Sequence, residues 1–287
     1  MSEPPKTESD VFFATHAVFT TDEFDAFLAA RSTEASAGRA EARQTLLRHH
    51  LKHQKILRVR RGLYASVPAG HRPDSYPVDS YLIAARLTKD GVLAYHTALA
   101  LHGLAQSVRE ERITLSGETA SRSFRFRGIL YRTLAPPAEL PLEQALSFGV
   151  ETMDRQGMSV RVTSVERTLV DAFDRLKLCG GWEEVWRSLE GLDLFLDFSL
   201  ITRYVSLLDN ATTAAKVGFF LERFQDRLQV PASALEALQR CAPKQPHYVE
   251  RGRRSEARLV SRWNLLIPAN FEATNASRNA VGEDIPR

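Results

Sequence analysis

The feature that most constrains the fold is the stretch "ILRVRRGLYAS" at residues 56–66. It contains two short runs that favour strands, separated by an arginine pair and Gly62. A glycine at this point supplies the positive φ that a tight hairpin turn needs. We therefore expect a β-hairpin with arginines on and beside its turn. Since side chains alternate along a strand, Leu57 and Val59 are expected to face a core, and the arginines that alternate with them, Arg58 and Arg60, the opposite side.

Two helical patterns precede this hairpin. The first starts at Thr20, whose side chain can cap a helix and is followed by acidic residues suited to the helix dipole. A second pattern follows a break at residues 32–38. A helical wheel brings Ala40, Leu47 and Leu51 together on one side of it. The opposite side is predicted to be polar and collects Glu41, Thr45, Arg48, His49 and Lys52.

Positive charge is concentrated in this part of the chain. Residues 39–61 contain eight Lys or Arg and one Glu, a balance of +7, whereas the whole chain carries +3, so the remainder carries −4. Such clustering is typical of a nucleic-acid-binding module, because contacts with phosphates supply most of the non-specific affinity. The order helix, break, helix and basic hairpin predicts a winged helix-turn-helix, provided that residues 12–18 form a first short helix.

On this interpretation the hairpin becomes the wing, and the polar side of the second helix meets base edges and phosphates. Tyr64 is expected either to pack on that helix or to hydrogen-bond a phosphate. The candidate DNA-binding residues are Arg39, Arg43, Thr45, Arg48, His49, Lys52, Arg58, Arg60 and Arg61.

The remainder of the chain is predicted to form a larger mixed α/β domain with a mostly helical C-terminal part, so the expected fold class is α+β. The stretch "VPAGHRPDSYP" interrupts both helix and strand and indicates a linker. The expected organisation is a disordered N-terminus at residues 1–10, the winged helix-turn-helix domain at 11–68, the linker at 69–78, the α/β regulatory domain at 79–268 and a disordered tail at 269–287.

Helices are expected at residues 79–88 and 94–103 of the larger domain, followed by strands at 112–117, 123–135 and 158–164. Thr163 and Glu166 have the spacing of a capping box, which predicts a helix over 164–177 that Gly180 and Gly181 terminate. Further helices are predicted near 182–190, 198–208, 213–227 and 232–240. A basic segment at 250–262 is either a solvated helix face or a partner-binding surface.

Composition and segment lengths disfavour a membrane or secreted protein. No stretch approaches eighteen uninterrupted apolar residues, and the first ten residues lack the basic start and apolar run of a signal peptide. We expect a cytoplasmic protein without a membrane partner. Cys179 and Cys241 lie far apart without a CxxC partner, so they are interpreted as ordinary thiols, with neither a zinc ribbon nor a disulfide framework.

The sequence does not favour catalysis or a cofactor. His49 and His53 have HExxH-like spacing, but the glutamate is missing and the neighbouring basic residues would repel a cation. The pairs Asp171 and Asp174, and Asp193 and Asp197, lack the spacing of the magnesium carboxylates of a nucleotidyltransferase. No Ser/His/Asp order, GxSxG elbow or Walker loop is present. A non-enzymatic protein is therefore expected.

Five blocks, in order, match one known family: "RVRRGLYA", "LAYHTALALHGL", "VTSVERTLVDAFDRLKLCGGWEEVW", "AAKVGFFLERF" and "WNLLIP". Over about residues 12–268 the chain resembles the AbiEi antitoxins of type IV toxin-antitoxin systems. The resemblance implies a transcriptional repressor of its own operon, bound to inverted repeats in double-stranded promoter DNA, with two copies possible on one operator.

It also implies that the larger domain neutralises a cognate nucleotidyltransferase toxin from the same operon. The block around Glu166 to Gly181 belongs to that domain by resemblance. The residues of this block either contact the partner directly or have a structural role. In the structural role, Gly180 and Gly181 end a helix, and Arg167 and Asp171 form an i,i+4 pair. The candidate partner-binding residues are Arg167, Asp171, Arg251, Arg253 and Arg254.

Two other classes of function remain open from the residues. One is a one-component transcriptional regulator whose larger domain binds a small ligand. The other is a nucleic-acid-modifying enzyme, either a nuclease or a nucleotidyltransferase, that uses the winged helix for delivery.

Overall fold

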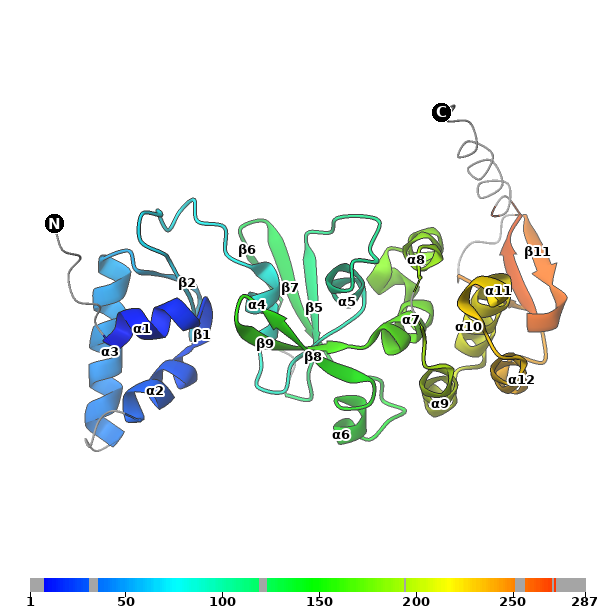
Figure 1. The fold of residues 1–287 in the computed structure, drawn as a ribbon, viewed down its shortest axis with the longest axis horizontal. Coiled ribbons are helices and arrows are strands. Elements are labelled where there is room, and N and C mark those ends of the chain that lie inside the picture. The colour runs from blue at the N-terminus through cyan, green and yellow to red at the C-terminus, as the bar shows by residue number, and fades with distance from the viewer. Residues whose placement is uncertain are drawn as a thin grey trace, which may run out of the picture. The chain divides into compact units, whose positions relative to one another are not determined.

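The computed structural model describes residues 8–30, 36–118, 123–193, 195–250, 256–269 and 271 (Figure 1). It contains helices and several separate sheets, so the expected α+β class is confirmed. The chain divides into two compact units. Unit 1 comprises residues 1–97, 109–136 and 142–163, and unit 2 comprises residues 98–108, 137–141 and 164–287.

Unit 1 begins with a small module of helices and one antiparallel sheet. Its sheet has the strand order β1-β3-β2. In chain order the elements are α1 (Glu8–Thr15), β1 (Val18–Thr20), α2 (Thr21–Ala29), α3 (Ser36–Lys52), β2 (Ile56–Arg60) and β3 (Leu63–Ser66). The first helix begins at Glu8, so the expected boundary between disorder and domain at residue 11 falls too late. The expected helix over 12–18 also extends too far along the chain, because α1 ends at Thr15 and Val18 already pairs with Ala65 of β3.

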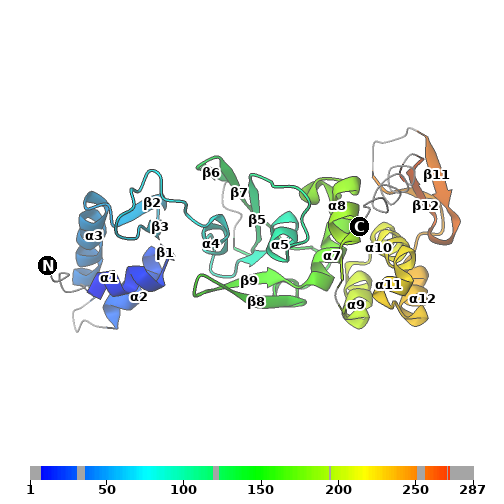
Figure 2. The same ribbon diagram turned by 45° about the horizontal axis from the view of Figure 1, so that its top comes forward.

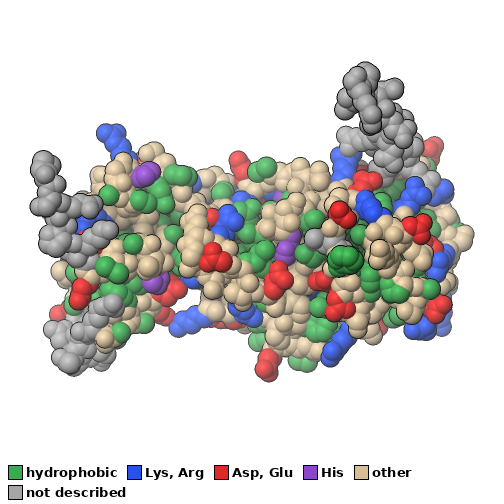
Figure 3. All heavy atoms as spheres, in the orientation of Figure 1, with side chains coloured by type: hydrophobic (Ala, Val, Ile, Leu, Met, Phe, Trp, Pro, Cys, Tyr) green, Lys and Arg blue, Asp and Glu red, His purple; other side chains and the backbone are tan. Residues whose placement is uncertain are grey.

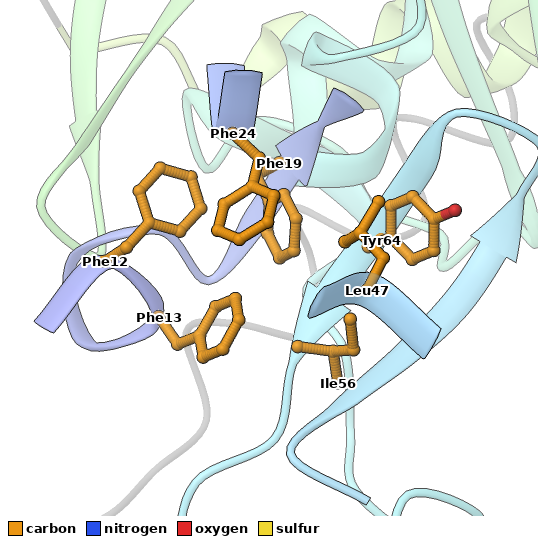
Figure 4. Close-up of a cluster of buried hydrophobic side chains, with 7 residues drawn as sticks. All are labelled: Phe12, Phe13, Phe19, Phe24, Leu47, Ile56 and Tyr64. Carbon is orange, nitrogen blue, oxygen red and sulfur yellow. The ribbon is translucent and has the colours of Figure 1, made fainter. Parts of the chain in front are cut away.

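A cluster of aromatic side chains forms the core of this module. Figure 4 shows four phenylalanine rings from α1, β1 and α2 gathered opposite residues of α3 and the hairpin. The buried members are Phe12, Phe13, Phe19, Phe24, Leu47, Ile56 and Tyr64. Each such side chain stabilises the fold by about 1.5–3 kcal/mol on burial, so the cluster holds α3 and the hairpin to one support. Tyr64 packs in this core with its ring stacked on that of Phe19, which is one of its two expected roles.

The rest of unit 1 is built around a six-stranded sheet of order β6-β7-β5-β4-β9-β8. No helix or strand interrupts residues 67–79, as the prolines indicated. The elements of this part are α4 (Ser80–Ala85), β4 (Val92–Leu93), β5 (Glu111–Leu115), β6 (Phe124–Phe126), β7 (Ile129–Leu134), α6 (Leu142–Ala145), β8 (Val150–Arg155) and β9 (Met158–Thr163). The helix α5 (His96–Leu101) follows β4, so the two helices expected at 79–88 and 94–103 are present but shorter.

Two strands of this sheet were not expected, the short β4 and the edge strand β8. β8 pairs antiparallel with β9 at one edge, where Figure 2 shows the two strands side by side. Its sequence is VETMDR, and none of its residues is buried. An edge strand that does not enter the core lacks the apolar alternation by which a strand is recognised in a sequence.

Unit 2 is mostly helical, as expected. Its helices are α7 (Val165–Asp174), the short η1 (Leu176–Cys179), α8 (Trp182–Glu190), α9 (Phe198–Leu208), α10 (Ala211–Arg223), α11 (Gln225–Leu228) and α12 (Ala232–Cys241). Gly180 follows η1 with φ 100°, which explains why a glycine stops the helical run there. The expected capping box is wrong in detail. Ser164 is the cap of α7 and accepts from the backbone N–H of Arg167, while the Glu166 carboxylate accepts from the backbone N–H of Asp197.

The basic segment at 250–262 had two interpretations, and its described residues do not form the helix that one of them required. Residues 257–263 form a strand and a short 3-10 turn, within a small sheet of order β10-β12-β11. These elements are β10 (His247–Tyr248), β11 (Ala257–Val260), η2 (Ser261–Trp263) and β12 (Leu265–Pro268). Phe271 is buried against the rings of Trp182 and Trp186, so ordered packing extends past the expected domain end at residue 268.

Candidate nucleic-acid interface

The helix α3 is anchored on one side and exposed on the other. Leu47 is 5% exposed in the aromatic cluster, with Leu46 and Leu51 packed against it. Ala40, which was expected on this side, is exposed, because the described side chains of α3 that pack in the cluster lie in the C-terminal half of the helix. The polar side chains expected on the opposite face are all exposed, namely Glu41, Thr45, Arg48, His49 and Lys52.

His50 lies on the anchored side of α3, three residues after Leu47, and was not singled out by the sequence pattern. Its ring is 4% exposed and packs edge-on against Phe13, with ring centroids 4.9 Å apart. Neither ring nitrogen has a hydrogen-bond partner among the described residues. Burial, reinforced by the neighbouring cations, lowers the pKa of His50 to about 4. The ring is therefore neutral near pH 7 and contributes packing, while the adjacent His49 remains exposed.

Arg43 has a partner that the sequence did not predict. Its guanidinium lies 3.2 Å from the Asp25 carboxylate of α2, so this arginine links the two helices. Both side chains are partly exposed, and such pairs contribute up to about 1 kcal/mol. The side chain of Arg39 lies outside the described residues.

The hairpin has the expected turn. Gly62 has φ +81°, the left-handed conformation that favours glycine. Leu57 and Val59 are each 8% exposed and face inward, as predicted. Arg58 and Arg61 are exposed beside the turn.

Arg60, the remaining arginine of the hairpin, does not follow the expected alternation. The guanidinium of Arg60 donates to the Leu87 carbonyl at 2.8 Å and lies 5.2 Å from the centre of the Phe124 ring. Burial lowers the pKa of Arg60 from its ordinary value. The pairing register shifts between Arg58 and Arg60, and such a bulge re-aims the side chain that follows it. Arg60 therefore contacts the rest of unit 1, whereas the expected alternation had placed it with Arg58 on the side away from the core.

The candidate partner-binding pair of unit 2 is also corrected. Arg167 and Asp171 are 0% and 2% exposed on α7, and their side chains form an ion pair at 3.3 Å. The Tyr204 hydroxyl donates to the other oxygen of Asp171 at 2.7 Å. Burial raises the pKa of Asp171, while the Arg167 charge and this hydrogen bond oppose the rise. These residues belong to the helical core and are inaccessible to a partner. Arg251, Arg253 and Arg254 lie outside the described residues.

Positively and negatively charged side chains are mixed on the surface. Figure 3 shows Lys and Arg interspersed with Asp and Glu over the face drawn there.

Among the described residues, no group of three or more His, Cys, Asp or Glu side chains is placed to hold a metal ion. In the same part of the chain, no helix combines the length and apolar character needed to cross a membrane.

Comparison with known proteins bears on the fold. No family model matches the chain, and no curated protein matches it. The crystal structure of the RV2827C protein from Mycobacterium tuberculosis is similar, with a TM-score of 0.56, 14% sequence identity and coverage of 96% of each chain. The two proteins thus share a fold over nearly their whole length.

Proposed function

We propose that residues 8–67 form a winged helix-turn-helix that binds double-stranded promoter DNA. The helix α3 reads the major groove, and the hairpin β2–β3 is the wing. The contacts come from the exposed side chains Thr45, Arg48, His49, Lys52, Arg58 and Arg61. The observation that carries this proposal is the exposed polar face of α3, held beside exposed wing arginines by one aromatic core.

The order of elements supports the assignment. Helix, strand, helix, helix, strand and strand is the order of winged helix-turn-helix domains, and the sheet order β1-β3-β2 agrees with it. Anchoring a helix through leucines on one side while its other side stays polar is what a recognition helix requires.

The biological role we propose follows from the family resemblance. The protein represses its own operon promoter by binding inverted repeats, and it neutralises a cognate nucleotidyltransferase toxin encoded in the same operon. It acts by binding, without catalysis of its own. The burial of Arg167 and Asp171 limits the toxin-contacting residues to others on the surface.

Binding to a duplex from the upstream region of its own gene tests the DNA assignment. Arg48→Ala is expected to cost about 1–3 kcal/mol and to relax preference at one base position. Arg58→Ala is expected to weaken binding to all sequences and to lower the salt slope by about one, because one phosphate contact is lost. Arg240→Ala, an exposed arginine on α12, is the control. Unchanged affinity for both variants at physiological salt would overturn the assignment.

A further inference from the structure

The hairpin β2–β3 is joined to the remainder of unit 1 by Arg60. Leu87, whose carbonyl accepts from Arg60, lies two residues beyond the end of α4, after the cap residue Arg86. A hydrogen bond from a charged donor is stronger than one between neutral groups. The Phe124 ring adds a cation–π contact. Arg60 is half-buried, and its guanidinium makes both contacts with residues outside the hairpin.

A second contact joins the start of α2 to the end of α4. One oxygen of Glu23 accepts from the backbone N–H and the hydroxyl of Thr20, at 2.7 Å and 3.0 Å, and closes the capping box of α2. The other oxygen lies 2.9 Å from Nε of Arg86. Glu23 therefore has two separable roles. The capping role needs an oxygen acceptor, while the pairing with Arg86 also needs the negative charge.

A third pair is much weaker. Asp22 and Lys89 lie 2.8 Å apart, but their side chains are 66% and 81% exposed. An exposed pair contributes little because water screens it. Asp22 thus provides a matched control for Glu23, one position away on the same helix.

The space around these contacts is hollow. A cavity of about 540 Å³ is lined by the start of α2, the hairpin turn and the residues that follow α4. This open space leaves part of the junction without close packing, although Leu63 and Leu87 are buried. The polar contacts of Arg60 and Glu23 therefore contribute to the orientation of the module.

We propose that Arg60 and the Glu23–Arg86 pair are positioning residues: they latch the N-terminal module to the six-stranded sheet of unit 1 and thereby set the direction of α3. Their effect on DNA rests on the proposed function. Two copies on an inverted repeat place two recognition helices at a fixed spacing. A latched module holds α3 in the orientation that this spacing requires. A released module must lose conformational freedom on binding, which lowers its affinity.

Spin-label distance measurements on the full chain test the latch without DNA. The exposed residues Gln44 on α3 and Thr152 on β8 are changed to cysteine and labelled, with Cys241→Ser to remove the exposed native thiol. The latched protein is expected to give one narrow distance distribution. Arg60→Ala and Glu23→Gln are expected to broaden it, although Gln retains the capping oxygen. Arg60→Lys is expected to restore part of the narrow peak, and Asp22→Asn to leave it unchanged.

A distribution that stays narrow in both Arg60→Ala and Glu23→Gln would overturn the proposal. Thermal unfolding of each variant checks that broadening does not come from loss of the fold. Because this readout contains no DNA, it judges the latch even if the wild-type protein binds no promoter duplex, an outcome that would overturn the proposed function alone.

The second readout compares one half of the operator with the whole. Arg60→Ala is expected to bind the half-operator duplex with the affinity of the wild type. On the whole operator its affinity is expected to be about fivefold lower or more, because simultaneous binding of two copies requires both recognition helices to be correctly oriented. Weaker binding to the half-operator with a salt slope lower by about one would instead identify Arg60 as a phosphate ligand and overturn the latch.

Discussion

His50 is a buried base on a helix that otherwise presents cations to solvent. Its pKa of about 4 in the folded protein lies below the ordinary value of 6.5. As the pH falls below 6.5, the unfolded chain takes up a proton that the folded chain resists, so stability is expected to fall between pH 6.5 and pH 4. A tenfold difference in proton affinity corresponds to about 1.4 kcal/mol, so a pKa difference of 6.5 minus about 4 corresponds to a loss of roughly 3 kcal/mol.

Urea unfolding at several pH values checks this expectation. His50→Leu removes the titrating group, so the free energy of unfolding of the variant is expected to lose less on going from pH 7 to pH 4.5 than that of the wild type. His53→Leu, an exposed histidine one turn further along, is the control. Parallel pH profiles for the wild type and His50→Leu would contradict the assigned pKa.

At the scale of one element, α10 depends on a glycine that the sequence alone does not explain. A Cβ at Gly218 would lie 2.1 Å from the Trp263 ring, so the ring packs directly on the helix backbone. The Trp263 indole N–H also donates to Glu222 at 2.6 Å. Gly218 and Trp263 belong to two sequence blocks forty-five residues apart, and the contact explains why a glycine and a tryptophan occur at these positions.

Gly218→Ala is expected to destabilise unit 2 by about 3 kcal/mol, because an overpacked core must shift backbone or ring. Gly191→Ala is the control, since nothing lies within 4 Å of the added carbon there. In Gly218→Ala/Trp263→Phe the smaller ring is expected to recover part of the loss. Thermal unfolding measures all three, and equal midpoints for Gly218→Ala and Gly191→Ala would refute the packing argument.

On the scale of the whole molecule, the proposed activities belong to different parts of the chain. DNA contact is assigned to α3 and the hairpin of unit 1, so a change there is expected to affect repression alone. In cells that carry the operon, Arg48→Ala is expected to raise expression from the promoter while still protecting growth from the adjacent nucleotidyltransferase. A promoter reporter and a growth assay measure the two effects separately.

Two results would speak against this division. Loss of growth protection by Arg48→Ala, at an unchanged protein level, would place the toxin contact on the DNA-binding face. Failure of the wild type to protect growth would contradict neutralisation while leaving the DNA assignment to the duplex assay.

The sequence by itself determined the amphipathic elements, the Gly62 turn and the inward side of the hairpin, since these depend on local periodicity and on the special φ of glycine. Only the tertiary structure decided the direction of Arg60, the burial of His50 and the enclosure of Arg167 with Asp171. Each depends on residues distant in the chain: the Leu87 carbonyl beyond α4, a phenylalanine ring and a tyrosine hydroxyl. A charged residue in a local pattern is equally suited to solvent or to a buried partner, and the fold provides that partner.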